Sequence, residues 1–241
     1  MKVSVILPAA GLGTRMGRAS PEKAGTSRKQ FMLLDGAPIL LHTIRKFVAC
    51  PLVSEIVVAL RREERQWVGE MLRREQLARP VRMAAGGDTR QESVGNALAS
   101  LADGVDLVAV HDAVRPFIDP ATIEKVILEA AETGAAIVGI VPVDTVKQVH
   151  RNKIRATIPR DRLVLAQTPQ VFRYDLLREA FARAAEDGFA GTDEASLVER
   201  LDRVEVSVVA GSDRNLKITK PSDMDLARLF LSQEQAARKA S

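Results

Sequence analysis

Short apolar runs recur along the chain, and they constrain its fold more than any other feature. The runs are VSVIL (3–7), EIVVAL (55–60), DLVAV (106–110), AAIVGIV (135–141) and VEVSVVA (204–210). Continuous runs of this length, rich in valine, isoleucine and alanine, are typical of strands covered on both faces in a mostly parallel sheet. Each run is therefore predicted to be a buried strand.

Segments with helical spacing lie between these runs. Apolar residues follow the i, i+3, i+4, i+7 pattern at Val94, Ala97, Leu98 and Leu101, and again at Ile123, Val126, Ile127 and Ala130. Asp119 and Pro120 predict the cap and first turn of the second helix. Strands alternating with helices predict one α/β domain over residues 1–232, a doubly wound, mostly parallel sheet. Ligands of such a sheet bind at the carboxyl ends of its strands.

Residues 146–157, VKQVHRNKIRAT, break this alternation. Their loose apolar and polar alternation around RNK predicts an exposed β-hairpin. A hairpin of this length cannot bury itself on one small domain, so we expect an arm over residues 142–163 that packs on a second subunit in a homodimer. The polar residues 233–241 are expected to form a disordered tail.

Composition excludes several classes of protein. The 35 basic and 31 acidic residues give a net charge of +4, the basic residues are scattered, and only 4% of residues are aromatic. This balance suits small anions and argues against a nucleic-acid partner. A lone Cys50 and histidines at positions 42, 111 and 150 predict neither a disulfide nor a zinc site, and favour a cytoplasmic location. No apolar window approaches the ~20 residues of a membrane span, and the first run is too short for a secretory signal.

The first apolar run leads into PAAGLGTRMG, residues 8–17. Its glycines, Gly11, Gly13 and Gly17, are spaced one residue too widely for the dinucleotide motif G-x-G-x-x-G, and no Gly-Lys-Ser/Thr sequence of a P-loop follows. Asp35 stands roughly where a ribose-binding acid would lie, but LLDGAP reads as a turn. A ligand-free turn is one interpretation of the loop. Arg15, a fixed positive charge among small residues, favours a phosphate site.

PAAGLGTRMG followed by KQF (29–31) resembles the signature of sugar-nucleotide pyrophosphorylases and related nucleotidyltransferases, which share a Rossmann-like fold. Further motifs narrow the resemblance to 2-C-methyl-D-erythritol 4-phosphate cytidylyltransferases, and their order in the chain is that seen in this family. These motifs are GGDTRQESV (86–94), VHDAVRP (110–116), PVDTVK (142–147), LAQTPQVF (165–172), TDEAS (192–196) and NLKITKPSD (215–223). The resemblance extends from Val3 to about Leu231.

The resemblance implies a role for the charged residues. Arg15 and Lys29 look like the charges that hold the triphosphate of CTP and stabilise the transition state. Lys217 and Arg160 look like the pair that positions the incoming phosphate. Arg160 and Thr145 flank the hairpin, so the resemblance implies that both reach the partner subunit's site. Without the resemblance, Lys29 and Lys217 would both be interpreted as solvated surface lysines.

Further residues of these motifs are candidates for substrate binding. The resemblance adds Ala9, Ala10, Gly11, Gly13, Thr168 and Thr192 to the pocket, although Thr192 could instead cap a helix. Paired glycines let the backbone press against a flat ring.

Gly87, Asp88 and Ser93 are accordingly candidates for base or ribose binding. Alternatively they form a tight turn in which Asp88 helps to cap the following helix. Asp112, just beyond a predicted strand, could meet a sugar hydroxyl or a magnesium ion, or form a buried ion pair with Arg115, also a binding candidate. His111 reads as structural.

The chain departs from the family pattern between Gly17 and Lys29. This stretch is longer than the usual family loop, and Arg28 replaces the proline generally found before Lys-Gln. Lys23 could therefore compete with Lys29 for its role, but KQF carries the match, which favours Lys29.

The resemblance implies transfer of the cytidylyl group of CTP to 2-C-methyl-D-erythritol 4-phosphate, with release of pyrophosphate and with Mg²⁺ held mainly through the CTP phosphates. A phosphate monoester is already anionic near neutral pH, so no activated serine, cysteine or histidine is required. One alternative is a cytidylyltransferase for another polyol phosphate, such as ribitol 5-phosphate. Alternatives from other classes are a non-catalytic nucleotide-binding module and a nicotinamide-dependent enzyme; the loop spacing argues against the latter.

Overall fold

The computed structural model describes residues 1–11 and 28–240, with residues 238–240 described in their backbone alone. Within these residues seven strands form the main sheet, in the order β11-β7-β10-β6-β1-β4-β5. The strands are β1 (Val3–Pro8), β4 (Val53–Leu60), β5 (Val81–Ala85), β6 (Leu107–Val110), β7 (Ala135–Ile140), β10 (Leu165–Arg173) and β11 (Ser207–Ala210). Parallel pairing joins β11 to β7 and links β6, β1, β4 and β5. The predicted doubly wound, mostly parallel sheet is confirmed.

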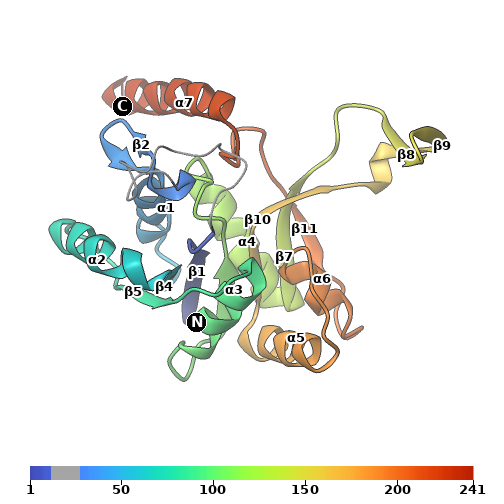
Figure 1. Ribbon diagram of the computed structural model, residues 1–241, viewed down its shortest axis with the longest axis horizontal. Coiled ribbons are helices and arrows are strands. Elements are labelled where there is room, and N and C mark those ends of the chain that lie inside the picture. Colours follow the sequence, from blue (N-terminus) through green and yellow to red (C-terminus); the bar gives the residue numbers. More distant parts are fainter. Residues whose placement is uncertain (12–27, 241) are drawn as a thin grey trace.

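Helices cover both faces of this sheet (Figure 1). They are α1 (Ile39–Val48), α2 (Arg65–Arg74), α3 (Arg90–Ala99), α4 (Pro120–Thr133), α5 (Tyr174–Glu186), α6 (Glu194–Glu199) and α7 (Pro221–Ala240). The buried side chains of α1, α2 and α4 share one core cluster, and those of α3, α5 and α6 share the other. Asp119 caps α4 through the Thr122 amide at 3.2 Å, as predicted.

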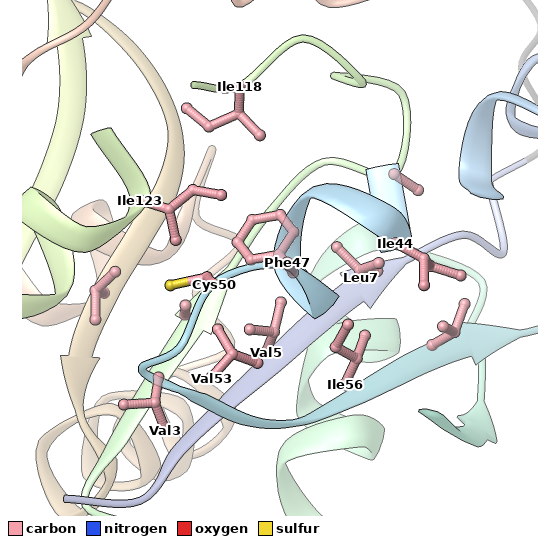
Figure 2. Close-up of a cluster of buried hydrophobic side chains, with 14 of the residues drawn as sticks. Val3, Val5, Leu7, Ile44, Phe47, Cys50, Val53, Ile56, Ile118 and Ile123 are labelled. Atoms are coloured by element: carbon pink, nitrogen blue, oxygen red, sulfur yellow. The ribbon is translucent and has the colours of Figure 1, made fainter. Parts of the chain in front are cut away.

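The two cores follow from alternation along each strand. Val5 and Leu7 of β1 point into one cluster while Ile6 points into the other, and all three are fully buried. Figure 2 shows the first cluster, in which Phe47 of α1 lies near Val5 of β1. Burying apolar side chains on both faces explains why the sequence shows unbroken apolar runs here.

β10 runs antiparallel to both neighbours, β6 and β7. Gln170 pairs with Val110, the last residue of β6, so residues 167 and 168 extend past the carboxyl end of β6. There they lie beside the loop that begins at His111. This strand therefore brings polar side chains to the rim where ligands of such sheets bind.

The predicted hairpin is confirmed. β8 (Val146–His150) and β9 (Lys153–Ile158) form a two-stranded antiparallel sheet, joined by Arg151 and Asn152 with positive φ angles. The hairpin projects from the body of the protein, away from α2 (Figure 1). A short helical turn, η5 (Arg160–Arg162), follows it.

Two expectations need correction. The run at 204–210 becomes a strand only at Ser207, and the strand order places β11 at an edge of the sheet. It is not covered on both faces, since Val208 is 50% exposed. The expected disordered tail from Gln233 is instead helical, because α7 continues to Ala240. Tertiary contacts hold it: Glu234 pairs with Lys46 of α1 at 2.8 Å and Gln235 donates to Asp35 at 2.7 Å.

Asp35 lies in a turn, as expected. It joins β2 (Leu33–Leu34) to β3 (Ala37–Pro38), and both Asp35 and Gly36 have positive φ angles. Apolar side chains of this hairpin, of the loop after β6 and of α7 form a third buried cluster.

Candidate active site

A cavity of about 240 Å³ opens at the carboxyl ends of β1, β5 and β6. The predicted residues that line it are Ala9, Ala10, Gly11, Lys29, Gly87, Asp88, Ser93, Asp112 and Lys217. They come from segments far apart in the sequence. Lys29 belongs to a short helical turn, η3 (Lys29–Phe31), and Lys217 precedes α7. The fold thus gathers most of the predicted nucleotide residues in one place.

A second cavity of about 190 Å³ adjoins the first. Predicted residues Arg115, Thr168 and Thr192 line it together with Asp112 and Lys217. Arg90, Asp112 and Lys217 line both cavities, so the two meet at this group.

Other predicted residues are not brought together with these cavities. Thr145 and Arg160 are exposed at the root of the arm, and neither lines either cavity within residues 1–11 and 28–240. Arg160 instead donates to the carbonyl oxygen of Val143 at 2.5 Å, across that root. Gly13, Arg15 and Lys23 lie outside the described residues.

Asp112 is the centre of a buried charge cluster. Its Oδ1 pairs with the Nε of Arg90 at 3.3 Å, and its Oδ2 pairs with Arg115 at 3.2 Å and with Lys217 at 2.9 Å. Burial alone would raise the pKa of Asp112, but Arg90, Lys217 and Arg115 outweigh it and hold that pKa far below its usual range. The alternative of an Asp112–Arg115 ion pair is confirmed, and the carboxylate balances two more cations besides.

His111 and Thr168 fix the loop that carries Asp112. The ring Nε2 of His111 lies 3.0 Å from the Arg115 carbonyl oxygen, which can only accept, so Nε2 carries the proton. Nδ1 therefore accepts from the Thr168 hydroxyl at 3.0 Å, and that hydroxyl oxygen accepts from the Asp112 amide at 3.1 Å. Burial lowers the pKa of His111 to about 4, so the imidazole is neutral at pH 7. This geometry fits the structural reading of His111.

Flanking side chains hold Lys29 at the cavity. Gln30 is buried and donates to the carbonyl oxygens of Ala9 at 2.6 Å and Gly11 at 3.2 Å. On the other side, Arg28 pairs with Glu63 at 3.0 Å and with Glu64. The arginine that replaces the family's proline therefore ties this turn to the segment after β4.

The turn at 86–89 shows why both glycines are needed. A Cβ on Gly86 would lie 2.2 Å from the Ala10 Cβ, and one on Gly87 would lie 2.3 Å from the Glu92 Cβ. The Ser93 hydroxyl donates to the Thr89 carbonyl at 2.9 Å and accepts from the Gly87 amide at 3.0 Å. The two glycines and the hydrogen bonds of Ser93 therefore shape the turn at 86–89, which lines the first cavity.

Two capping alternatives are wrong. The suggestion that Asp88 helps to cap α3 fails because Thr89 is the N-cap, accepting from the Glu92 amide at 3.0 Å. Similarly, α6 is capped by Asp193 through the Ser196 amide at 3.0 Å rather than by Thr192. Asp88 and Thr192 line the first and the second cavity, respectively.

Sequence reasoning missed Arg90, Gln30 and Glu194. Arg90 lies in the first turn of α3, two residues after Asp88, and joins Asp112 to the buried Glu194. The quoted motifs contain all three residues. Their positions in the sequence could have indicated them, because each lies one or two residues from a predicted site residue at the carboxyl edge of the sheet.

Within residues 1–11 and 28–240, no cluster of three or more histidine, cysteine or acidic side chains could hold a metal ion. Asp88 and Asp112 are the carboxylates that line the first cavity. Such a donor set fits a Mg²⁺ ion held mostly by substrate phosphates, which usually needs one or two protein carboxylates. None of the described helices is both long enough and apolar enough to cross a membrane.

The two cavities meet at a cation-rich junction at the carboxyl strand ends, a site suited to polyanionic substrates, and the comparisons with known proteins identify the chain as a nucleotidyltransferase. Residues 3–233 match the sequence profile of 2-C-methyl-D-erythritol 4-phosphate cytidylyltransferase. The chain belongs to this family. Membership of this family excludes the alternative of a nicotinamide-dependent enzyme.

Individual relatives agree. The enzyme of this name from Solibacter usitatus is 66% identical over 98% of both chains, and that from Acidobacterium capsulatum is 52% identical over 98% of this chain and 100% of its own. A crystal structure of 4-diphosphocytidyl-2C-methyl-D-erythritol synthase from Anaerococcus prevotii superposes with a TM-score of 0.84 at 27% identity, covering 95% of this chain and 96% of that one. The Thermus thermophilus cytidylyltransferase gives 0.77 at 32%, covering 95% and 98%.

Proposed function

We propose that the first cavity binds CTP, that the second binds 2-C-methyl-D-erythritol 4-phosphate, and that the cytidylyl group is transferred where they meet. The products are 4-diphosphocytidyl-2-C-methyl-D-erythritol and pyrophosphate, the reaction of the family. One observation supports this arrangement above others: Arg90, Asp112 and Lys217 line both cavities. Cations at such a junction can bring two polyanions together.

The reaction needs no protein nucleophile. An oxygen of the acceptor phosphate attacks the α-phosphorus of CTP, the bond from that phosphorus to the oxygen bridging the β-phosphorus breaks, and pyrophosphate leaves with the electron pair. Lys29 and Lys217 offer positive charge at the first cavity, and Lys217 also faces the second. By resemblance, Arg15 adds to the charge at the triphosphate and Arg160 to that at the acceptor phosphate. These charges would stabilise the transition state.

Recognition of the cytidine is assigned to the segments that follow β1 and β5. Ala9, Ala10, Gly11, Gly87 and Asp88 line the cavity there, and Ser93 holds the turn after β5 in shape. Mg²⁺ bound mainly to the CTP phosphates would neutralise part of their charge. Asp112 already balances three cations, so Asp88 offers the less engaged carboxylate for that ion.

The experiment that tests this function is pyrophosphate release from CTP with a panel of polyol phosphates, with and without Mg²⁺. We expect release with 2-C-methyl-D-erythritol 4-phosphate and at least a 100-fold lower kcat/KM with ribitol 5-phosphate or with UTP in place of CTP; this ratio is about 3 kcal/mol. Comparable rates with ribitol 5-phosphate would favour that alternative. CTP binding in calorimetry without turnover on any acceptor would favour a non-catalytic nucleotide-binding module.

The arm is proposed to join two subunits in a homodimer. Apolar side chains are exposed on the hairpin at Val149 (55%) and Ile154 (66%), and at its root at Val143 (76%). Solvent-exposed apolar groups gathered on a projecting hairpin favour a protein partner. A partner seated there would also allow Thr145 and Arg160 to reach its cavity, as the resemblance implies.

A cytoplasmic location stays a proposal, which rests on the lone Cys50 and the disulfide that it cannot form within the chain.

Replacing residues 147–156 by a short linker is expected to convert the dimer to a monomer in sedimentation velocity, because it removes the exposed apolar side chains of Val149 and Ile154. Leu128→Ser is a matched control, since Leu128 is an exposed apolar residue of α4 (56%) outside the arm. An unchanged dimer after removal of the hairpin would contradict the proposal.

A further inference from the structure

Arg90 occupies the junction of the two cavities, where the two substrates are proposed to meet. It lies in the first turn of α3, and its side chain is 30% exposed. Its Nε pairs with Asp112 at 3.3 Å and its Nη1 donates to Glu194 at 2.7 Å. Its Nη2 makes no hydrogen bond within residues 1–11 and 28–240, and this atom is not buried. A guanidinium has five N–H donors, so donors remain for a ligand.

Glu194 holds Arg90 from behind. Its side chain is 2% exposed, and Oε1 accepts from Arg90. Its Oε2 is buried and has no hydrogen-bond partner among the described residues. A buried carboxylate satisfied by a single arginine is costly unless that arginine stays in place. Glu194, at the start of α6, therefore fixes the direction of the guanidinium.

The charge of Arg90 is secure in this setting. Burial alone would lower its pKa, but the carboxylates of Glu194 and Asp112 outweigh that effect and raise it. Asp112 divides its negative charge among three cations, so the junction keeps positive charge for an incoming anion. A planar, always-charged group with spare N–H donors suits a phosphate whose charge increases during reaction.

We propose that Arg90 is a further catalytic residue that binds the non-bridging oxygens of the transferring α-phosphate, and that Glu194 is its positioning residue. The inference rests on the proposed function, because it needs both substrates in their cavities. Arg90 contacts one carboxylate oxygen of Asp112 and Lys217 contacts the other. The α-phosphate would therefore lie between the cations of Arg90 and Lys217.

Arg90→Gln is expected to lower kcat on the order of 100-fold with at most a several-fold change in KM for CTP, as for loss of one transition-state donor. Arg90→Lys should recover part of the loss. Glu194→Gln should lower kcat less, on the order of 10-fold. Glu194→Asp should also have a lowered kcat, because its shorter side chain leaves the carboxylate too far from Arg90 to hold it. The matched controls are Arg82→Gln and Glu55→Gln, a pair of the same types joined at 2.8 Å that lines neither cavity; we expect near-normal kcat for both.

A second measurement tests the contact itself. CTP carrying sulfur at one non-bridging α-phosphate oxygen exists as two diastereomers, and the wild-type enzyme should prefer one of them. If Arg90 binds that phosphate, Arg90→Lys should change this preference at least several-fold, a readout that a merely structural role would not move. An unchanged preference together with normal kcat in Arg90→Gln would overturn the inference. Failure of wild-type enzyme to turn over CTP would instead count against the proposed function.

Discussion

Lys29→Ala is expected to lower kcat for pyrophosphate release by about 100- to 1,000-fold, the usual effect of losing one donor to a developing negative charge. Lys29 lines the first cavity and is held there from both sides, by Gln30 on the carbonyl oxygens of the loop after β1 and by Arg28 on Glu63. The turn that carries Lys29 is therefore fixed at the edge of the cavity. Steady-state kinetics at saturating acceptor, with CTP varied, measures the change.

Lys125→Ala is the control for this variant. Lys125 is exposed on α4 and lines neither cavity, so its loss should leave kcat unchanged. Lys29→Arg should retain more activity than Lys29→Ala because it keeps the charge. A kcat of Lys29→Ala near that of the wild type would exclude Lys29 as a catalytic residue and would favour Lys23 in its place.

Asp112→Asn is expected to lower the free energy of unfolding by about 3–5 kcal/mol at pH 7, and to abolish most activity. The carboxylate is 8% exposed and pairs with Arg90, Arg115 and Lys217, so its loss leaves three cations in mutual repulsion. Removing one partner of a buried ion pair typically has an effect of this size. Urea unfolding followed by circular dichroism measures it.

The pH dependence of this difference has a definite sign. The pKa of Asp112 is depressed in the folded protein, whereas the pKa of an aspartate in an unfolded chain is about 3.9. The stabilisation by Asp112 is therefore fully present above that unfolded pKa and is lost as pH falls toward the folded pKa. The stability gap between wild type and Asp112→Asn should accordingly shrink below about pH 4. Asp225→Asn removes an exposed pair with Arg228 and should change stability little at any pH; a comparably small effect for Asp112→Asn would contradict the prediction.

The sequence predicted those parts of the fold where burial dictates residue type. Val5 and Ile6 point into opposite cores, and such two-sided burial leaves an unbroken apolar run. β10 gave no such signal, because its buried Gln167, Thr168 and Gln170 are polar and are satisfied by hydrogen bonds. The end of α7 was missed for the converse reason: its polar composition looks solvated, and the contacts that hold it come from α1 and Asp35.

The candidate site divides in a similar way. Lys29, Asp112 and Lys217 could be grouped because motifs mark their positions at strand ends. Arg90 was missed although it lies two residues after Asp88, because an arginine in the first turn of a helix usually faces solvent. The fold shows that it pairs with Glu194, 104 residues away. Arg15 stays a sequence prediction, since it lies outside the described residues.

The arm leaves and rejoins the sheet at adjacent points, because Ile140 at the end of β7 pairs with Leu165 at the start of β10. It is therefore topologically a loop between neighbouring antiparallel strands, and a change in its length costs the sheet little. Insertions, deletions or exchange of the whole arm between relatives would leave the registers of β7 and β10 intact. The length of the arm can thus change without altering the part of the sheet that carries the two cavities.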